Sequence, residues 1–120
     1  MNKIATIILN RNLPEPTNKL VEHIKHFDGE YNDVYVLEAG SDRELISKYA
    51  TWFADTEEIK KNGLRYPRGM NYALLNLWKE KKWDIYDAFF LITNDTELSK
   101  EKTIEKLSEI LNRHKRIGIL

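Results

Sequence analysis

The amino-acid sequence predicts an α/β fold: a mostly parallel, doubly wound sheet with helices on both faces, in three layers. Short apolar runs alternate with longer stretches in which apolar residues recur every three or four positions. This alternation is typical of βαβ units, which build parallel sheets. The chain of 120 residues is 42% apolar, enough for one domain with a real core and too short for two ordinary domains.

The first strand is predicted over 4–9, a continuous and largely β-branched run that suits a strand covered on both faces. Pro14 and Pro16 are then expected in a loop. A helix follows and ends at Asp28-Gly29, and its apolar positions are Leu20, Val21, Ile24 and Phe27. A second strand is predicted over 34–37.

Ser41 and Glu44 form an S-x-x-E capping box, which predicts a second helix carrying an apolar stripe as far as Phe53. The polar segment 55–62 is expected to be the frayed end of that helix and a loop. Residues 63–66 are compatible with a short strand.

A third helix is expected to begin near Pro67 and to bury Met70, Ala73, Leu74, Leu77 and Trp78. The next strand is predicted over 85–92, and Ser99 is expected to cap a fourth helix. Residues 117–120 indicate a further strand. The three tryptophans are expected in the core, because they fall on helical stripes or at a helix end.

Composition excludes several classes of protein. Lys plus Arg and Asp plus Glu both number 19, so the formal charge is zero and no global attraction to nucleic acid is expected. Cysteine is absent, which suits the reducing cytoplasm and excludes disulfides. Neither a membrane span nor a signal-peptide core is found. The sequence has no G-x-G-x-x-G, no Walker lysine loop and no nucleophile elbow, which argues against dehydrogenases, P-loop NTPases and α/β-hydrolases.

Polar residues follow three of the predicted strands, at 10–12, 38–42 and 93–96. Ligands of parallel sheets bind beyond the carboxyl ends of the strands. Asp95 could therefore hold Mg²⁺ or Mn²⁺, which prefer oxygen ligands and share them with phosphates. The alternative is that 94–96 only makes an Asx-type turn.

Two further segments have both a functional and a structural interpretation. Glu38 could accept hydrogen bonds from a ribose or a base, or it could belong to an ordinary strand-to-helix loop. Arg65 or Arg68 could meet phosphate at the start of a helix, or the segment could be a solvated loop.

Taken in order, four segments resemble the nucleotide-binding half of inverting family 2 glycosyltransferases, which have the Rossmann-like GT-A fold. The segment 5–12 is similar to the opening strand of that family, which ends in an asparagine, and 34–42 is similar to its second, acidic strand. The segment 64–74 resembles the loop that leads to an asparagine at a helix start, and 89–98 resembles the strand with the short acidic metal-binding motif. The four segments read ATIILNRN, VYVLEAGSD, LRYPRGMNYAL and FFLITNDTEL.

The resemblance implies a role for each matching residue. Asp95 would bind the divalent metal, Mn²⁺ or Mg²⁺, and Asn94 would face the ribose. Glu38 would contact the ribose or the base. The other nucleotide-sugar-binding residues would be Leu9 and Arg11 beside the base, Asn12 at the end of the first strand, and Arg65 and Asn71 near the diphosphate or sugar. Ala39 and the single carboxylate of Thr93-Asn94-Asp95 depart from the pattern of the family.

The resemblance implies a glycosyltransferase that transfers a sugar from a nucleoside diphosphate to an acceptor hydroxyl on a saccharide, a lipid or a protein. We expect residues 1–120 to be a single nucleotide-sugar-binding domain that lacks the acceptor-binding half, and to be inactive alone. The general base would lie outside this chain. One alternative is a GT-A-like interaction module that has lost the chemistry. A sugar-phosphate nucleotidyltransferase fits less well, because 10–18 supplies no glycine-rich loop.

Overall fold

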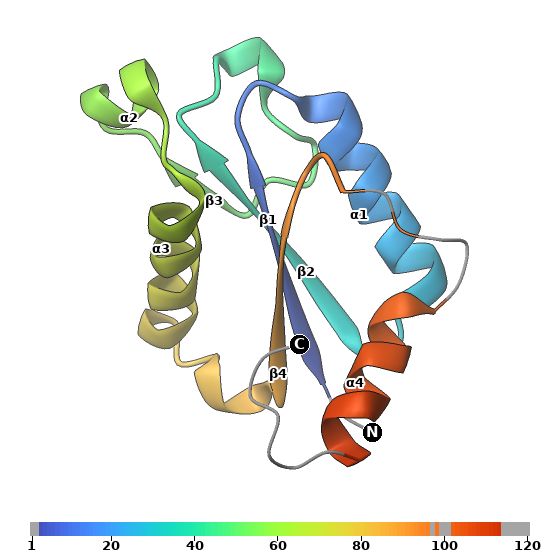
Figure 1. The fold of residues 1–120 in the computed structure, drawn as a ribbon. Helices are drawn as coiled ribbons and strands as arrows, with labels where there is room; N and C mark the ends of the chain where they lie inside the picture. The colour runs from blue at the N-terminus through green and yellow to red at the C-terminus, as the bar shows by residue number, and fades with distance from the viewer. Residues whose placement is uncertain (1–2, 97, 99–101, 114–120) are drawn as a thin grey trace.

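The computed structural model describes residues 3–96, 98 and 102–113. Its centre is a four-stranded sheet in the order β3-β2-β1-β4, in which every neighbouring pair is parallel (Figure 1). The strands are β1 (Ile4–Asn10), β2 (Asn32–Ala39), β3 (Trp52–Ala54) and β4 (Ala88–Thr93).

Helices cover both faces of this sheet, so the predicted three-layer α/β fold is confirmed. α1 (Pro14–Asp28) and α4 (Thr103–Arg113) lie on one face, and α3 (Tyr66–Lys79) lies on the other (Figure 1). Between β3 and α3 the chain forms the short helix α2 (Glu57–Asn62). Two single 3-10 turns complete the described elements, η1 (Arg43–Leu45) and η2 (Trp83–Ile85).

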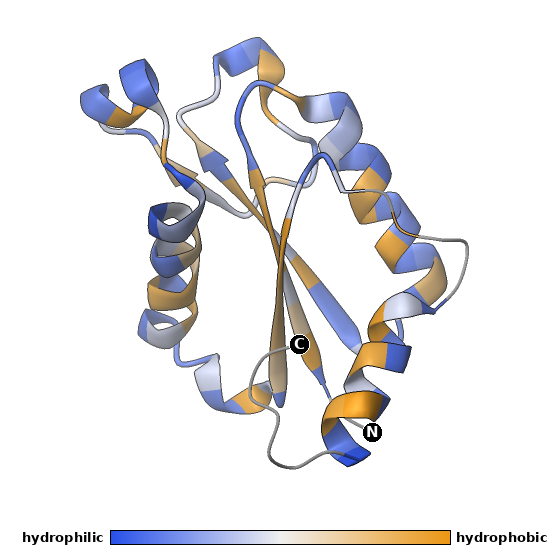
Figure 2. Ribbon diagram, viewed as in Figure 1, coloured by the Kyte–Doolittle hydropathy of each residue, from blue (hydrophilic) through white to orange (hydrophobic). Residues whose placement is uncertain are grey.

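Alternate residues of β1, β2 and β4 pack into two separate cores, one on each face of the sheet. Ile4 and Ile8 of β1 join Val36, Ile92 and α1 in one cluster. The intervening residues Ala5 and Ile7 pack with α3 in the other cluster. The strands consequently contain apolar residues on both faces (Figure 2), as expected for a parallel sheet covered by two helical layers.

Three of the predicted strands and three of the predicted helices are confirmed, with shifts of a few residues at their ends. β4 begins at Ala88, three residues later than predicted, because the segment before it forms η2. The prediction that Pro14 and Pro16 lie in a loop is wrong, since both belong to the first turn of α1. Proline is well suited to that turn, where backbone N–H groups have no helical partner.

The predicted helix over 41–53 is wrong. The Ser41–Glu44 pattern leads only to η1, and residues 52–54 form the edge strand β3. The Ser41 hydroxyl donates to Glu38 Oε1 at 2.6 Å, so it is engaged with β2 rather than with a helix N-terminus. Burial of Ala54 beside β2 outweighs the helical spacing of the apolar residues.

Two neighbouring predictions also fail. The segment 55–62 is not a frayed end, because Thr56 Oγ1 accepts from Ile59 N and begins α2. The segment 63–66 is not a strand, since Arg65 is the N-cap of α3 and Tyr66 is its first residue.

Trp78 is not in the core, as its side chain is 65% exposed. The buried positions of α3 are Met70, Ala73 and Leu77, and Trp78 lies about 100° further around the helix than Leu77. Trp83 is also outside the core, 38% exposed, with its ring packed on Phe89 at a centroid distance of 4.6 Å. The predictions that Ser99 caps a helix and that 117–120 form a strand concern residues outside the described part of the chain.

No helix among the described residues is long and apolar enough to cross a membrane.

Candidate site at the carboxyl edge of the sheet

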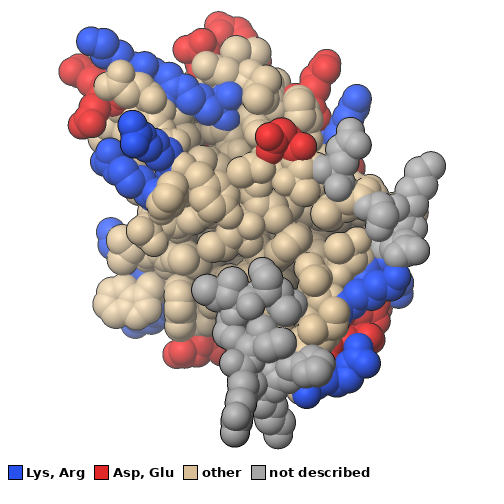
Figure 3. Space-filling view, viewed as in Figure 1, with Lys and Arg blue, Asp and Glu red and all other residues tan. Residues whose placement is uncertain are grey.

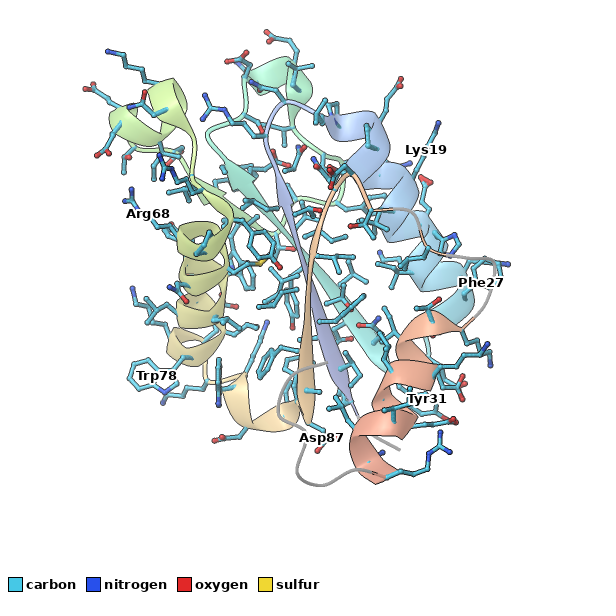
Figure 4. All side chains as sticks on the ribbon, in the orientation of Figure 1. Lys19, Phe27, Tyr31, Arg68, Trp78 and Asp87 are labelled. Carbon is cyan, nitrogen blue, oxygen red and sulfur yellow. The ribbon has the colours of Figure 1, made fainter. Side chains whose placement is uncertain are left out.

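The strand order creates a switch point between β1 and β4. The chain moves from β1 to β2 to β3 in one direction and then returns to place β4 on the other side of β1. Ligands of open α/β sheets bind outside the carboxyl ends of the strands at such a point. The strand ends and loops that meet there are 10–13, which begins with the last residue of β1, and 93–96, which begins with the last residue of β4. The candidate site is built from their side chains (Figure 4).

Asn10 makes hydrogen bonds to several elements at this edge of the sheet. It is the last residue of β1 and is fully buried. Its Nδ2 donates to both carboxylate oxygens of Glu38, at 2.8 and 3.0 Å. Its Oδ1 accepts from Leu13 N, Thr17 Oγ1 and Asn94 Nδ2, at 3.1, 3.0 and 3.2 Å. One amide therefore connects the ends of β1, β2 and β4 with the first turn of α1.

Glu38, expected to contact a ribose or a base, is only 2% exposed. Besides Asn10, its carboxylate accepts from Ser41 Oγ at 2.6 Å and from Ser47 N at 2.9 Å. Such a set of donors satisfies a buried carboxylate without a counter-ion. In this structure Glu38 holds the 40–47 loop against the sheet, and its oxygens are occupied by protein donors.

Asn94, expected to face a ribose, also turns inward. Its Nδ2 donates to Asn10 Oδ1 and to Thr17 Oγ1, both at 3.2 Å. Thr17 and Ser47 were not among the predicted site residues, although both are buried. The burial of Thr17 could have been predicted from the sequence. It lies three, four and seven residues before the apolar positions 20, 21 and 24 of α1, and therefore on the same face of the helix.

Asp95, the predicted metal ligand, is exposed directly after β4. The Thr93 hydroxyl donates to its Oδ1, and Thr96 N donates to Thr93 O at 3.2 Å, which closes a turn. The segment 93–96 therefore forms a turn, closed by a backbone hydrogen bond and not by an Asx side chain, with the carboxylate still at the surface. No group of three or more His, Cys, Asp or Glu side chains that could hold a metal is found among residues 3–96, 98 and 102–113.

A groove of about 530 Å³ lies between this turn and the first turns of α1. Its lining includes Asp95 and Asn94 from the turn, and Glu15, Lys19 and His23 from α1. Lys19 was not predicted as a site residue, and its side chain extends from α1 into solvent (Figure 4). The groove therefore combines carboxylate oxygens, which suit Mg²⁺ or Mn²⁺, with one cation that suits a phosphate.

Arg11 and Asn12, expected near the base, support the surrounding loops. Arg11 donates to the carbonyls of Ile59 at 2.9 Å, Lys60 at 3.2 Å and Lys61 at 3.3 Å, so it caps the carboxyl end of α2. Asn12, with φ of 58°, donates from its backbone N to Ser41 Oγ and accepts from Asp42 N through Oδ1.

Leu9, Arg65 and Asn71 lie on the α3 side of the edge. Leu9 packs against Gly69, where an added Cβ would stand 2.7 Å from Leu9 Cδ1. Tyr66 donates from its hydroxyl to Leu91 O at 2.9 Å, so the first turn of α3 also touches β4. Arg65 and Asn71 are exposed at the start of α3, across the sheet from the groove.

The first turn of α3 contains no acidic residue but carries Arg65 at the N-cap and Arg68. Neither guanidinium has a hydrogen bond or ion pair with the rest of the described chain. Cations are unfavourable at the positive end of a helix dipole. These two arginines therefore leave a positive potential at the sheet edge that an anion would neutralise.

Comparison of the chain with models of protein families, with curated proteins and with solved structures gives no match in any of the three.

Proposed function

We propose that this chain binds a nucleoside diphosphate sugar together with Mg²⁺ or Mn²⁺, as the donor-binding part of a glycosyltransferase. The observation that carries the proposal is the exposed carboxylate of Asp95, at the switch point between β1 and β4 and beside a groove. A groove of about 530 Å³ is within the usual size range of small-molecule sites.

In this proposal the metal bridges Asp95 and the diphosphate. One carboxylate suffices when phosphate oxygens and water complete the coordination shell of the ion. The hydrogen bond from Thr93 fixes one oxygen of Asp95 and leaves the other for the metal. Glu15, in the lining of the same groove, is a second carboxylate for the shell. When bound, the metal would stabilise the charge of the departing diphosphate.

The diphosphate would meet Lys19 in the groove, with Arg65 contributing long-range attraction from the other side of the edge. Asn94, Glu38, Arg11 and Asn12 would act by positioning the loops, since their side chains already bond to protein atoms. Leu9 packs against Gly69 on the α3 side, so it would not contact a nucleotide bound in this groove. The acceptor would be a saccharide, a lipid or a protein with a hydroxyl group, and the absence of cysteine fits the cytoplasmic location that the proposal assumes.

A second candidate function is a binding module without transferase chemistry. It is favoured because the Glu38 carboxylate accepts hydrogen bonds inside the protein, so that Asp95 is the exposed member of the two predicted acidic site residues. This candidate predicts no metal-dependent nucleotide binding.

Calorimetric titration with UDP, GDP and dTDP, each with and without Mn²⁺, tests the proposal. We expect metal-dependent binding of one nucleotide, weakened at least tenfold by Asp95→Asn, because the carboxylate charge holds the ion. Asp55→Asn is the matched control: Asp55 is likewise an exposed carboxylate directly after a strand, and its replacement should leave binding unchanged. Failure of the folded protein to bind any of the three would leave the binding module as the better account.

A further inference from the structure

The outer face of α3 combines exposed apolar side chains with cations. Leu75 and Trp78 are 53% and 65% exposed. Tyr72, nearer the first turn of α3, is 37% exposed. Arg68 and Lys79 lie on the same side, one near each end of the helix. Figure 4 shows Arg68 and Trp78 projecting from the side of α3 that faces away from the sheet.

The helical period brings these residues together. Met70, Ala73 and Leu77 are buried against the sheet, and the exposed residues occupy the opposite third of the helix. Tyr72 also donates from its hydroxyl to Phe53 O at 3.4 Å, which joins the 49% exposed Phe53 of β3 to the same surface. We call this surface, formed by Phe53, Arg68, Tyr72, Leu75, Trp78 and Lys79, the α3 face.

The charge of the α3 face is entirely positive. From Gly63 to Lys79 the sequence has no Asp or Glu. Next to the amino end of α3, the exposed Lys60 and Lys61 of α2 are balanced by the exposed Glu57 and Glu58 of the same helix, so the excess of positive charge comes from α3. Figure 3 shows Lys and Arg side chains over α2 and the start of α3, at the upper left of the molecule, with acidic side chains beside them over α2. The chain as a whole is neutral, so this positive charge is local.

We propose that the α3 face binds peripherally to the surface of an anionic lipid bilayer. A helix that presents aromatic and aliphatic side chains between flanking cations is suited to the interface between headgroups and acyl chains. Tryptophan and tyrosine favour that region, and each Lys or Arg near an anionic surface adds attraction. A protein partner for a face without acidic residues would need to be acidic and apolar at once, whereas anionic lipid supplies both features in one surface.

The binding mode has a definite orientation. α3 has 14 residues and is therefore about 21 Å long, and it runs along the sheet with its first turn at the carboxyl edge. A bilayer contacting the α3 face would lie beside the sheet edge that carries Arg65. The groove at Asp95 lies on the other face of the sheet and stays open to solvent. The two proposals are thus independent, and either can fail without the other.

Co-sedimentation with vesicles tests this proposal. One set of vesicles is phosphatidylcholine alone, and the other also contains phosphatidylglycerol. We expect binding to the anionic vesicles, weaker at high salt, and little binding to the neutral ones. Arg68→Glu should weaken the binding by roughly 30-fold, because two units of charge change at the surface. Arg43→Glu, an exposed arginine on η1, is the charge control.

Leu75→Glu tests the apolar contribution. We expect a loss of about tenfold or more, since a charge replaces a side chain that would enter the interface. Ile85→Glu is matched to it, because Ile85 is 50% exposed but lies on η2. A normal urea unfolding curve for each variant shows that the fold is kept.

Three outcomes would overturn the proposal: no binding of the wild type to anionic vesicles, equal binding to both kinds of vesicle, or an equal loss in Ile85→Glu. Light scattering after gel filtration adds a fourth. A wild-type dimer that Leu75→Glu converts to a monomer, without vesicle binding, would assign the α3 face to a second copy of the chain.

Discussion

Asn10 and Glu38 show how a single pair of polar side chains can organise the edge of a sheet. Both are fully or almost fully buried, at 0% and 2% exposed, among the apolar residues that face α1. Their hydrogen bonds reach Thr17 and Asn94 on one side and the 40–47 loop on the other. A buried polar network of this kind is stable because every strong donor and acceptor in it is paired. The groove at Asp95 depends on it for its shape.

We predict that Glu38→Gln destabilises the protein by about 1–3 kcal/mol. The carboxylate accepts from Asn10 Nδ2 and from Ser47 N. The Ser47 N–H can only donate, and the Asn10 amide is held in its orientation because its Oδ1 accepts three hydrogen bonds. A glutamine amide would place its own NH2 against one of these two donors. Urea unfolding monitored by circular dichroism measures the loss. Glu44→Gln, at an exposed position of η1, should have no effect, and equal stabilities for the two variants would contradict the prediction.

At the scale of elements, α2 is the part of the fold that depends most on tertiary contacts. It has six residues, none of them buried, and a helix this short is not stable by itself. The Arg11 guanidinium holds its carboxyl end through the carbonyls of Ile59, Lys60 and Lys61. Gly40, at φ of 74°, allows the close approach: an added Cβ would stand 2.4 Å from Ile59 O.

We predict that Arg11→Ala loosens α2 while the sheet remains intact. The amide of Gly63, which donates to Ile59 O at 2.7 Å, should exchange with solvent at least tenfold faster. Hydrogen exchange measured by mass spectrometry can separate this peptide from those of β1 and β2. Arg43→Ala is the control, as Arg43 is an exposed arginine on η1. Unchanged exchange at α2 in Arg11→Ala would show that another contact holds the helix.

At the scale of the whole molecule, the end of the sheet opposite the candidate site is closed by aromatic residues. Tyr35 stacks on Trp52 with ring centroids 5.0 Å apart and shares a short hydrogen bond with Tyr86. Tyr86 donates to Asp33 Oδ2 at 2.7 Å, and Lys3 Nζ lies 3.3 Å from the same oxygen. Side chains from β2, from Tyr86 directly after η2 and from Lys3 directly before β1 are therefore connected at this end of the sheet.

We predict that this cluster makes the protein less stable at alkaline pH. Burial raises the pKa of the Tyr86 hydroxyl far above its usual value, and the hydrogen bonds with Tyr35 and Asp33 raise it further. In the unfolded chain the hydroxyl ionises near pH 10. The folded state therefore keeps a proton that the unfolded state loses, and stability falls as pH rises above about 10.

Thermal unfolding between neutral and strongly alkaline pH measures this dependence. Tyr86→Phe should lower stability at neutral pH but flatten the alkaline decrease. Tyr72→Phe replaces an exposed tyrosine and should keep the wild-type slope. The same slope in Tyr86→Phe would assign the alkaline loss to other groups.

Much of the fold could be predicted from local patterns. Ile4 to Leu9 is apolar without interruption, as a central parallel strand requires, and Leu20, Val21 and Ile24 repeat with the period of a helix buried on one side. The pattern failed at 41–53, where a capping box and helical spacing described a helix that did not form. It also failed at Trp78, which falls outside the buried arc of α3.

For the candidate site, the sequence identified the positions that carry polar residues but not the direction of their side chains. Asp95 is exposed at the end of a strand, as expected. Glu38, Asn94 and Arg11 are at the same edge, and their side chains are bound to protein atoms. Thr17, Lys19 and Ser47 join the edge through contacts between elements that lie far apart in the chain.

The sequence by itself determined the elements whose burial is periodic, since hydrophobic spacing is a local property of the chain: the α/β class, the central strands and the two long helices that cover them. Tertiary structure alone decided that residues 52–54 pair with β2, that Glu38 is buried with its donors, and that the α3 face carries positive charge beside exposed aromatic side chains. Each of these depends on which segments meet in space, and the free energy of such contacts is set by partners distant in the sequence.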